Sequence, residues 1–148
     1  MDNSQILELY KLHVEMIDRV SQKRISQNQF YVTVLTGILG GFALVIDRKM
    51  IENSNYIYAT TGFIGLTICL LWFVNVRSYK KLNSAKFKVL AEIENKLEFQ
   101  FYEKEWQIIK KDKSYLKFST IEQLTPFIFS VPFFVMFVYA ISKLLCKT

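Results

Sequence analysis

Hydrophobic and polar residues are segregated along this chain into apolar runs and amphipathic, charged segments. Residues 30–46, 56–76 and 125–142 contain no charged side chain. Because about 20 helical residues cross a hydrocarbon core of about 30 Å, each run is close to the length of a membrane span. The pattern predicts an all-α membrane protein with transmembrane helices at residues 30–46, 56–76 and 125–145.

The charged segments, residues 1–29 and 77–124, have the periodicity of amphipathic helices. In the first, apolar residues recur at steps of three and four, as Leu7, Tyr10, Val14 and Ile17. In the second, a similar stripe comprises Leu82, Val89, Ile93, Leu97 and Phe101. No Gly or Pro separates either segment from its span, so both helices are expected to extend well beyond the membrane. Apolar stripes outside lipid need partners, which predicts a homo-oligomer.

The approach to the third span contains turn and capping signals. Residues 110–114 combine lysines with Asp and Ser and predict a turn. Ser119 and Glu122 have the spacing of a capping box that would begin a helix there. Alternatively, Thr125 caps the helix and Pro126 occupies its first turn, where a missing N–H costs nothing. Both beginnings are compatible with a helix that crosses the membrane.

Charge predicts the orientation of the three spans. The chain has 148 residues, 51% of them hydrophobic, with 19 Lys and Arg residues and a formal net charge of +6. Most of the basic residues lie in 1–29 and 77–124, which three spans place on the same side of the membrane. The positive-inside rule therefore predicts that the N-terminus and residues 77–124 are cytoplasmic and that the C-terminus is external.

Small residues gather in the first span. Gly37 and Gly41 form a G-x-x-x-G pattern with Gly40 beside them, and Thr33 and Thr36 lie one turn earlier. Small residues at this spacing let helices approach closely, either within one subunit or between subunits. The hydroxyls are also compatible with a water-filled passage. Since the spans contain no ionisable residue, a passive pore fits better than a proton-coupled transporter.

The densest polar cluster directly precedes the first span. Glu15 and Arg19 are four residues apart and are expected to form an ion pair, whereas Arg19 and Lys23 place like charges on one face. Together with Arg24, these basic residues would form a ring in a symmetric oligomer. Such a ring could bind a cytoplasmic anion or concentrate anions at a pore mouth. Equally, basic residues are common beside any first span.

Catalytic and metal-binding motifs are missing from the sequence. His13 is the only histidine, and there is no H-E-x-x-H, phosphate-binding loop or G-x-S-x-G motif. We therefore expect neither an enzyme nor a resident metal or cofactor.

Residues 12–24, followed by Asn28, Phe30 and Tyr31, resemble a family of small bacterial proteins, the RipA-like octameric membrane proteins. They are also similar to membrane effectors of Hailong-type anti-phage defence systems. The shared pattern has the form E-x-x-D-R-x-S-x-[RK]-R-x-x-x-N-x-F-[FY]. Besides the three basic residues, its signature positions are occupied here by Glu15, Asp18, Ser21 and Asn28.

The resemblance implies an oligomer in the bacterial inner membrane that acts as the toxic effector of an antiviral defence system. It also implies a nucleotidyltransferase partner whose nucleotide or oligonucleotide product controls an ion channel. We expect an anion-conducting channel that depolarises the cell when open. In this hypothesis Arg19, Lys23 and Arg24 bind the ligand or the conducted anion, and Thr33, Thr36, Gly37, Gly40 and Gly41 line the pore or pack its helices. The alternative is a non-conducting oligomeric scaffold that supports the envelope or docks a soluble partner.

Overall fold

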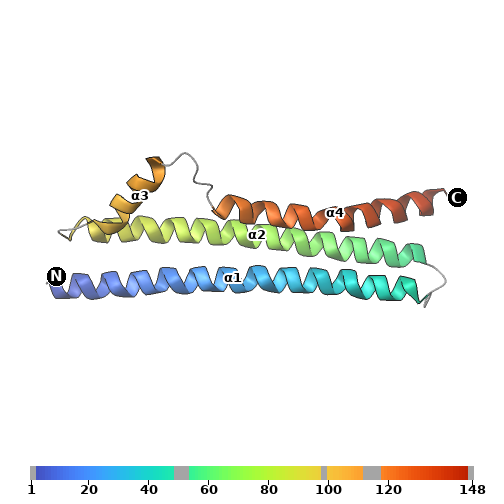
Figure 1. The fold of residues 1–148 in the computed structure, drawn as a ribbon, viewed down its shortest axis with the longest axis horizontal. Coiled ribbons are helices and arrows are strands. Elements are labelled where there is room, and N and C mark those ends of the chain that lie inside the picture. The colour runs from blue at the N-terminus through green and yellow to red at the C-terminus, as the bar shows by residue number, and fades with distance from the viewer. Residues whose placement is uncertain (1–2, 49–53, 98–99, 112–117, 147–148) are drawn as a thin grey trace.

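The computed structural model describes residues 3–48, 54–97, 100–111 and 118–146. These residues form four helices: α1 (Asn3–Asp47), α2 (Ser54–Glu94), α3 (Phe101–Lys111) and α4 (Phe118–Leu145). Helices α1 and α2 form a long antiparallel hairpin, and α4 lies along the half of α2 nearest the α1–α2 connection (Figure 1). Because α2 packs against both α1 and α4, it is the central helix of the molecule.

Three of the helices, α1, α2 and α4, are long and apolar enough to cross a membrane. This confirms the predicted all-α membrane protein with three spanning helices. At about 1.5 Å per residue, α1 is about 65–70 Å long, more than twice the thickness of a hydrocarbon core. The parts of α1 and α2 that lie outside their predicted spans are at the same end of the hairpin, together with α3 (Figure 1). We call this end of the molecule the extramembrane end.

The three long helices share a buried core near the middle of the hairpin. Its fully or nearly fully buried residues come from all three helices and comprise Leu35, Cys69, Trp72, Val76 and Phe133. The Trp72 ring is stacked on that of Tyr31, with ring centroids 5.6 Å apart, and meets Phe129 edge-on at 5.7 Å. Trp72 therefore connects α1 to α4 through the centre of the core.

Glycines allow α2 and α4 to approach closely. A Cβ atom on Gly62 would lie 2.8 Å from the backbone nitrogen of Phe137, and one on Gly65 would overlap the ring of Phe133. By contrast, a Cβ atom on Gly37, Gly40 or Gly41 of α1 would meet nothing within 4 Å. Within one subunit, the glycines of α2 therefore allow close helix packing, whereas those of the G-x-x-x-G pattern of α1 contact no other described helix.

The predicted amphipathic stripe from Leu82 to Phe101 does not form one helix. Helix α2 ends at Glu94, where Leu97 donates a backbone hydrogen bond to the Glu94 carbonyl at 2.9 Å and closes the last turn tightly. The Glu94 carboxylate then accepts the backbone N–H of Tyr102 at 3.1 Å. This bond turns the chain back, so that Phe87 of α2 meets the Tyr102 ring of α3 edge-on.

Both predicted capping residues of the third span lie inside α4. Ser119 follows the first described residue of the helix, Phe118, and is itself helical. Thr125 is deeper in the helix, where its hydroxyl donates to the carbonyl of Ile121 at 3.2 Å. Of the predicted turn at 110–114, residues 110 and 111 belong to α3, and residues 112–114 lie outside the described residues.

Candidate functional site

The outward-facing side of α1 carries small and hydroxylated residues through the first predicted span. Its exposed positions within the span include Thr33, Thr36, Gly37, Gly40 and Gly41. Thr33 donates its hydroxyl to the carbonyl of Gln29 at 2.9 Å, and Thr36 donates to that of Val32 at 2.7 Å. These internal bonds satisfy the donors and leave the hydroxyl oxygens on the surface as acceptors. The face is therefore polar, yet it does not disturb the helix.

The outward faces of α2 and α4 have a different composition. Within their spans they expose many large apolar side chains, including Phe63, Leu70, Leu71 and Val74 on α2, and Phe127, Ile128, Val131, Phe134 and Val135 on α4. The span of α1 exposes only two large apolar side chains, Phe30 and Leu44. Large apolar side chains suit lipid, so α2 and α4 present lipid-compatible faces, whereas α1 presents a face suited to protein or water.

The polar face of α1 continues into the extramembrane end. Arg19, Ser26, Thr33 and Gly40 are each seven residues apart, and all four are exposed. Because seven residues are nearly two helical turns, they lie in one row along the helix. We call the exposed surface around this row, from Glu15 to Gly41, the α1 polar face.

The charged end of the α1 polar face has one ion pair among the described residues. Arg19 Nη2 donates to Glu15 Oε1 at 2.7 Å, with the two side chains 72% and 58% exposed, so the pair contributes little to stability. Lys23 is also exposed and forms no ion pair with a described residue. Asp18 is exposed as well, and Ser21 is half-buried at the edge of the face.

Arg24 does not join Arg19 and Lys23 on the α1 polar face. Its side chain is 15% exposed and turns inward, where Nε lies 3.4 Å from Glu122 Oε1 of α4. Asn28 also donates to Glu122 Oε1, at 3.1 Å, and accepts the indole N–H of Trp72 at 2.8 Å. These four residues, Arg24, Asn28, Trp72 and Glu122, form what we call the polar junction. It connects α1, α2 and α4 where the spans meet the extramembrane end.

Further hydrogen bonds lie beside the polar junction. Asn75 of α2 donates to the Tyr31 hydroxyl at 2.9 Å, and Lys80 donates to Gln123 of α4 at 3.2 Å. The Glu122 carboxylate is 7% exposed, and its second oxygen, Oε2, has no hydrogen-bond partner among the described residues. A buried carboxylate that is only partly satisfied makes the polar junction sensitive to any movement of α4 relative to α1.

A second set of contacts connects α1, α2 and α3 at the far extramembrane end. The Tyr10 hydroxyl donates to Glu94 Oε1 at 3.1 Å, and Glu94 is 1% exposed. Burial and the nearby Glu94 carboxylate raise the pKa of Tyr10 to about 12. His13 Nε2 lies 3.0 Å from the Lys86 carbonyl, so this histidine contacts the hairpin backbone. Tyr10, Glu94 and Tyr102 thus hold the free end of the hairpin together.

Among the described residues, no group of three His, Cys, Asp or Glu side chains could hold a metal ion. Cys69 is buried, Cys146 is exposed, and both are free.

Local sequence patterns do not predict that Glu122 pairs with Arg24, or that Trp72 and Glu94 take part in polar contacts. The available signal was the isolated acidic residue Glu122, directly before an apolar span in a strongly basic segment. Such a residue is costly near a membrane unless a cation pairs with it. The asymmetry between the polar face of α1 and the apolar faces of α2 and α4 also became visible only when the packed faces were known.

Fold and surface together define an all-α membrane protein whose first helix presents an uncovered polar face. Residues 7–142 match the sequence model of the Octameric membrane protein family (8xMP), and the chain belongs to this family. The family description supports the predicted homo-oligomer in a membrane and agrees with the resemblance of residues 12–31. No curated protein and no solved structure matches the chain.

Proposed function

We propose that this protein forms a homo-oligomeric ion channel whose passage is lined by the α1 polar face. The observation that carries the proposal is the contrast between the three spans. The outward faces of α2 and α4 expose mainly large apolar side chains, with Thr60 and Thr67 of α2 as exceptions, whereas that of α1 exposes mainly threonines and glycines. In an oligomer with α1 at the centre and α2 and α4 outside, the α1 polar face meets water or protein, and the outward faces of α2 and α4 meet lipid.

In this arrangement the small residues of α1 both line the passage and pack against the neighbouring α1 helices. A ring of helices brings each α1 against its neighbours, and glycine lets the backbones come close. Gly37 and Gly41 lie toward one side of the face and favour such a contact. Thr33 and Gly40 lie in the middle row and Thr36 lies on its other side, where the hydroxyl oxygens of the threonines would meet water.

Arg19 and Lys23 would form the mouth of the channel. Repeated around a symmetry axis, their charges would raise the local anion concentration and favour anion conduction. Arg24 is not part of this mouth, because it is paired with Glu122 inside the subunit. In this proposal the mouth is cytoplasmic and the membrane is the bacterial inner membrane, as the basic residues and the resemblance favour.

The role in defence rests on the resemblance of residues 12–31 to effectors of Hailong-type systems. We propose a non-enzymatic toxin effector that depolarises the infected cell. A nucleotide or oligonucleotide made by a nucleotidyltransferase partner would control it by binding one state, open or closed, more tightly than the other. The polar junction is suited to transmit such a change, because it connects the ligand-facing helix α1 to α4.

Cysteine accessibility tests which helix lines the passage. In a background in which Cys69 and Cys146 are replaced by alanine and serine, Thr33→Cys, Thr36→Cys and Gly40→Cys are introduced one at a time. The matched controls are Leu71→Cys and Val131→Cys, which are also exposed in the subunit but lie on the apolar faces. The protein is reconstituted in vesicles and treated with a charged, water-soluble thiol reagent.

We expect modification of the α1 cysteines and protection of the two controls, because lipid excludes a charged reagent. Modification of an α1 cysteine should also reduce the ion flux through the vesicle membrane. Protection of all five positions together with an absence of flux would contradict the channel and favour the non-conducting scaffold. For nucleotide control, membrane potential is compared in cells that make this protein with and without its nucleotidyltransferase partner.

A further inference from the structure

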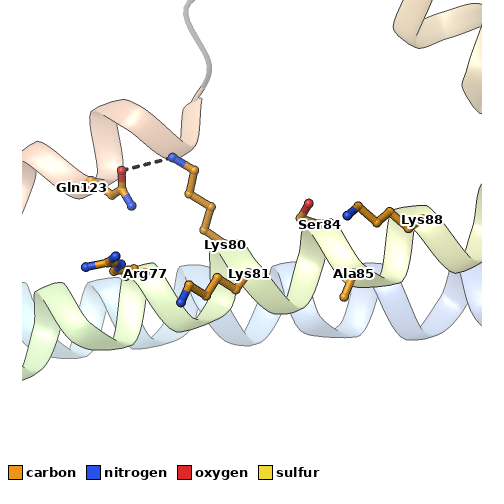
Figure 2. A pocket seen from close by; sticks show the side chains of 7 residues that line it. All are labelled: Arg77, Lys80, Lys81, Ser84, Ala85, Lys88 and Gln123. Atoms are coloured by element: carbon orange, nitrogen blue, oxygen red, sulfur yellow. Dashed lines mark hydrogen bonds between the residues drawn. The ribbon is translucent and has the colours of Figure 1, made fainter.

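A basic groove lies on α2 directly after its membrane span. Arg77, Lys80, Lys81 and Lys88 line it from α2, and Gln123 contributes from the beginning of α4 (Figure 2). Lys80 reaches across the groove to Gln123, to which it donates a hydrogen bond at 3.2 Å (Figure 2). The groove is open toward the outside of the subunit and lies away from the α1 polar face.

No described residue compensates the positive charge of this basic groove with an ion pair. Its lining contains no carboxylate, and Arg77, Lys81 and Lys88 form no ion pair with a described residue. Arg77 and Lys81 are four residues apart, a spacing at which like charges destabilise a helix. Among the described residues, Lys80 is hydrogen-bonded to a neutral amide, that of Gln123. Arg77 and Lys81 lie about one turn apart on one face of α2, and the oxygens of a phosphate group can accept hydrogen bonds from both.

The position of the basic groove beside the predicted membrane span indicates that the phosphate belongs to a lipid headgroup. Arg77 is the first residue after the predicted span 56–76, so the end of the groove at Arg77 and Lys81 lies near the depth of lipid headgroups. Leu70 and Val74 precede Arg77 and Lys81 by seven residues each and therefore lie on the same face of α2. Both are exposed. A continuous surface thus runs from apolar side chains within the membrane to cations at its boundary, and it matches the acyl chain and headgroup of one lipid.

We infer that the basic groove binds an anionic phospholipid, with its phosphate between Arg77 and Lys81 and its acyl chain along Leu70 and Val74. Since Lys80 connects the groove to Gln123, the neighbour of Glu122, a bound lipid stabilises the position of α4 beside the polar junction. The site is independent of the proposed channel, because it lies on the apolar outer side of the subunit.

Native mass spectrometry of the full-length protein in a neutral detergent tests this inference. Dioleoyl phosphatidylglycerol is titrated against the wild type and against the groove variant Arg77→Gln, Lys81→Gln, Lys88→Gln. The matched control removes the same charge from exposed lysines elsewhere, as Lys11→Gln, Lys96→Gln, Lys111→Gln. Dioleoyl phosphatidylcholine and inorganic phosphate are titrated in parallel, to separate an anionic lipid from a zwitterionic one and from free phosphate.

We expect the groove variant to weaken phosphatidylglycerol binding by at least about tenfold, because basic residues near a membrane surface attract anionic lipid. The control variant should change it less than about twofold. An equal effect of both variants would overturn the inference, and so would equal binding of phosphatidylcholine. Displacement of the lipid by inorganic phosphate would assign the groove to a soluble anion instead. If the triple variant elutes abnormally in size-exclusion chromatography, the single variant Lys81→Gln replaces it in the same comparison.

Discussion

At the residue scale, the polar junction depends on a single carboxylate. Glu122 Oε1 lies 3.4 Å from Arg24 Nε and accepts a hydrogen bond from Asn28 at 3.1 Å. Both partners are on α1, while Glu122 is on α4, and the two helices otherwise have few contacts. Removal of this carboxylate therefore leaves a largely buried guanidinium without its counterion and releases α4 from α1.

We predict that Glu122→Ala destabilises the protein by about 3–5 kcal/mol, the usual cost of breaking a buried ion pair on one side. Equilibrium unfolding in mixed detergent micelles, followed by circular dichroism, measures this change. The control is Glu103→Ala on the exposed surface of α3, which should change stability by less than about 0.5 kcal/mol.

The double variant Arg24→Met, Glu122→Leu extends this test. Replacing a buried ion pair by apolar residues of similar volume is often close to neutral, so the double variant should recover most of the lost stability. Equal stabilities of Glu122→Ala and Glu103→Ala would show that the polar junction does not hold α4.

At the element scale, helical periodicity predicts the elements better than it predicts their ends and partners. The long helix α1 follows from the sequence, since no Gly or Pro interrupts residues 3–36. The end of α2 does not, because the Glu94 carboxylate binds the backbone of Tyr102 in the next helix. That contact is tertiary, and a periodic stripe from Leu82 to Phe101 contains no sign of it.

The glycines likewise show that periodicity does not identify the packing partner of a helix. Both α1 and α2 contain small residues at helical spacing, and the sequence alone does not tell which pattern packs inside the subunit. In the structure, Gly62 and Gly65 of α2 meet the backbone and ring atoms of α4, whereas Gly40 of α1 meets nothing. The difference arises from the fold, because α2 lies between α1 and α4.

Alanine substitution of Gly65 and Gly40 should therefore change stability in opposite directions. At Gly65 the new methyl group overlaps the ring of Phe133, which is fully buried and has no space to move, so we expect a loss of about 1–3 kcal/mol. At Gly40 the methyl group is unobstructed, and alanine gains about 0.5–1 kcal/mol from its higher helix propensity. The same unfolding experiment in micelles measures both. A loss of stability at Gly40 as large as that at Gly65 would show that the outer face of α1 is already packed in the unfolding species.

At the scale of the whole molecule, the candidate site is a surface that one subunit leaves uncovered. The sequence places Arg19, Lys23 and Thr33 on one side of a single helix, and the structure shows all three exposed on α1. The sequence also groups Arg24 with them, but Glu122 removes it from the surface. That partner is 98 positions further along the chain, and local spacing contains no information about so distant a contact.

The charge at the proposed mouth can be reversed without disturbing the subunit. Lys23 is exposed on the α1 polar face and has no ion pair among the described residues, so Lys23→Glu leaves the polar junction and the core intact. In an oligomer the substitution replaces the positive charges of the Lys23 ring with negative ones, while the Arg19 charges stay paired with Glu15. Since a charged ring at a pore mouth attracts the opposite ion, the preferred ion should change from anion to cation.

The reversal potential under a potassium chloride gradient, measured across a planar bilayer, reports this preference directly. We expect the wild type to reverse toward the chloride equilibrium potential and Lys23→Glu to shift toward that of potassium. Lys96→Glu makes the same charge change beyond the end of α2, far from the α1 polar face, and should behave as the wild type does. An equal shift in both variants would indicate a general surface-charge effect. An unchanged reversal potential in Lys23→Glu, with conductance preserved, would place the ion pathway along a helix other than α1.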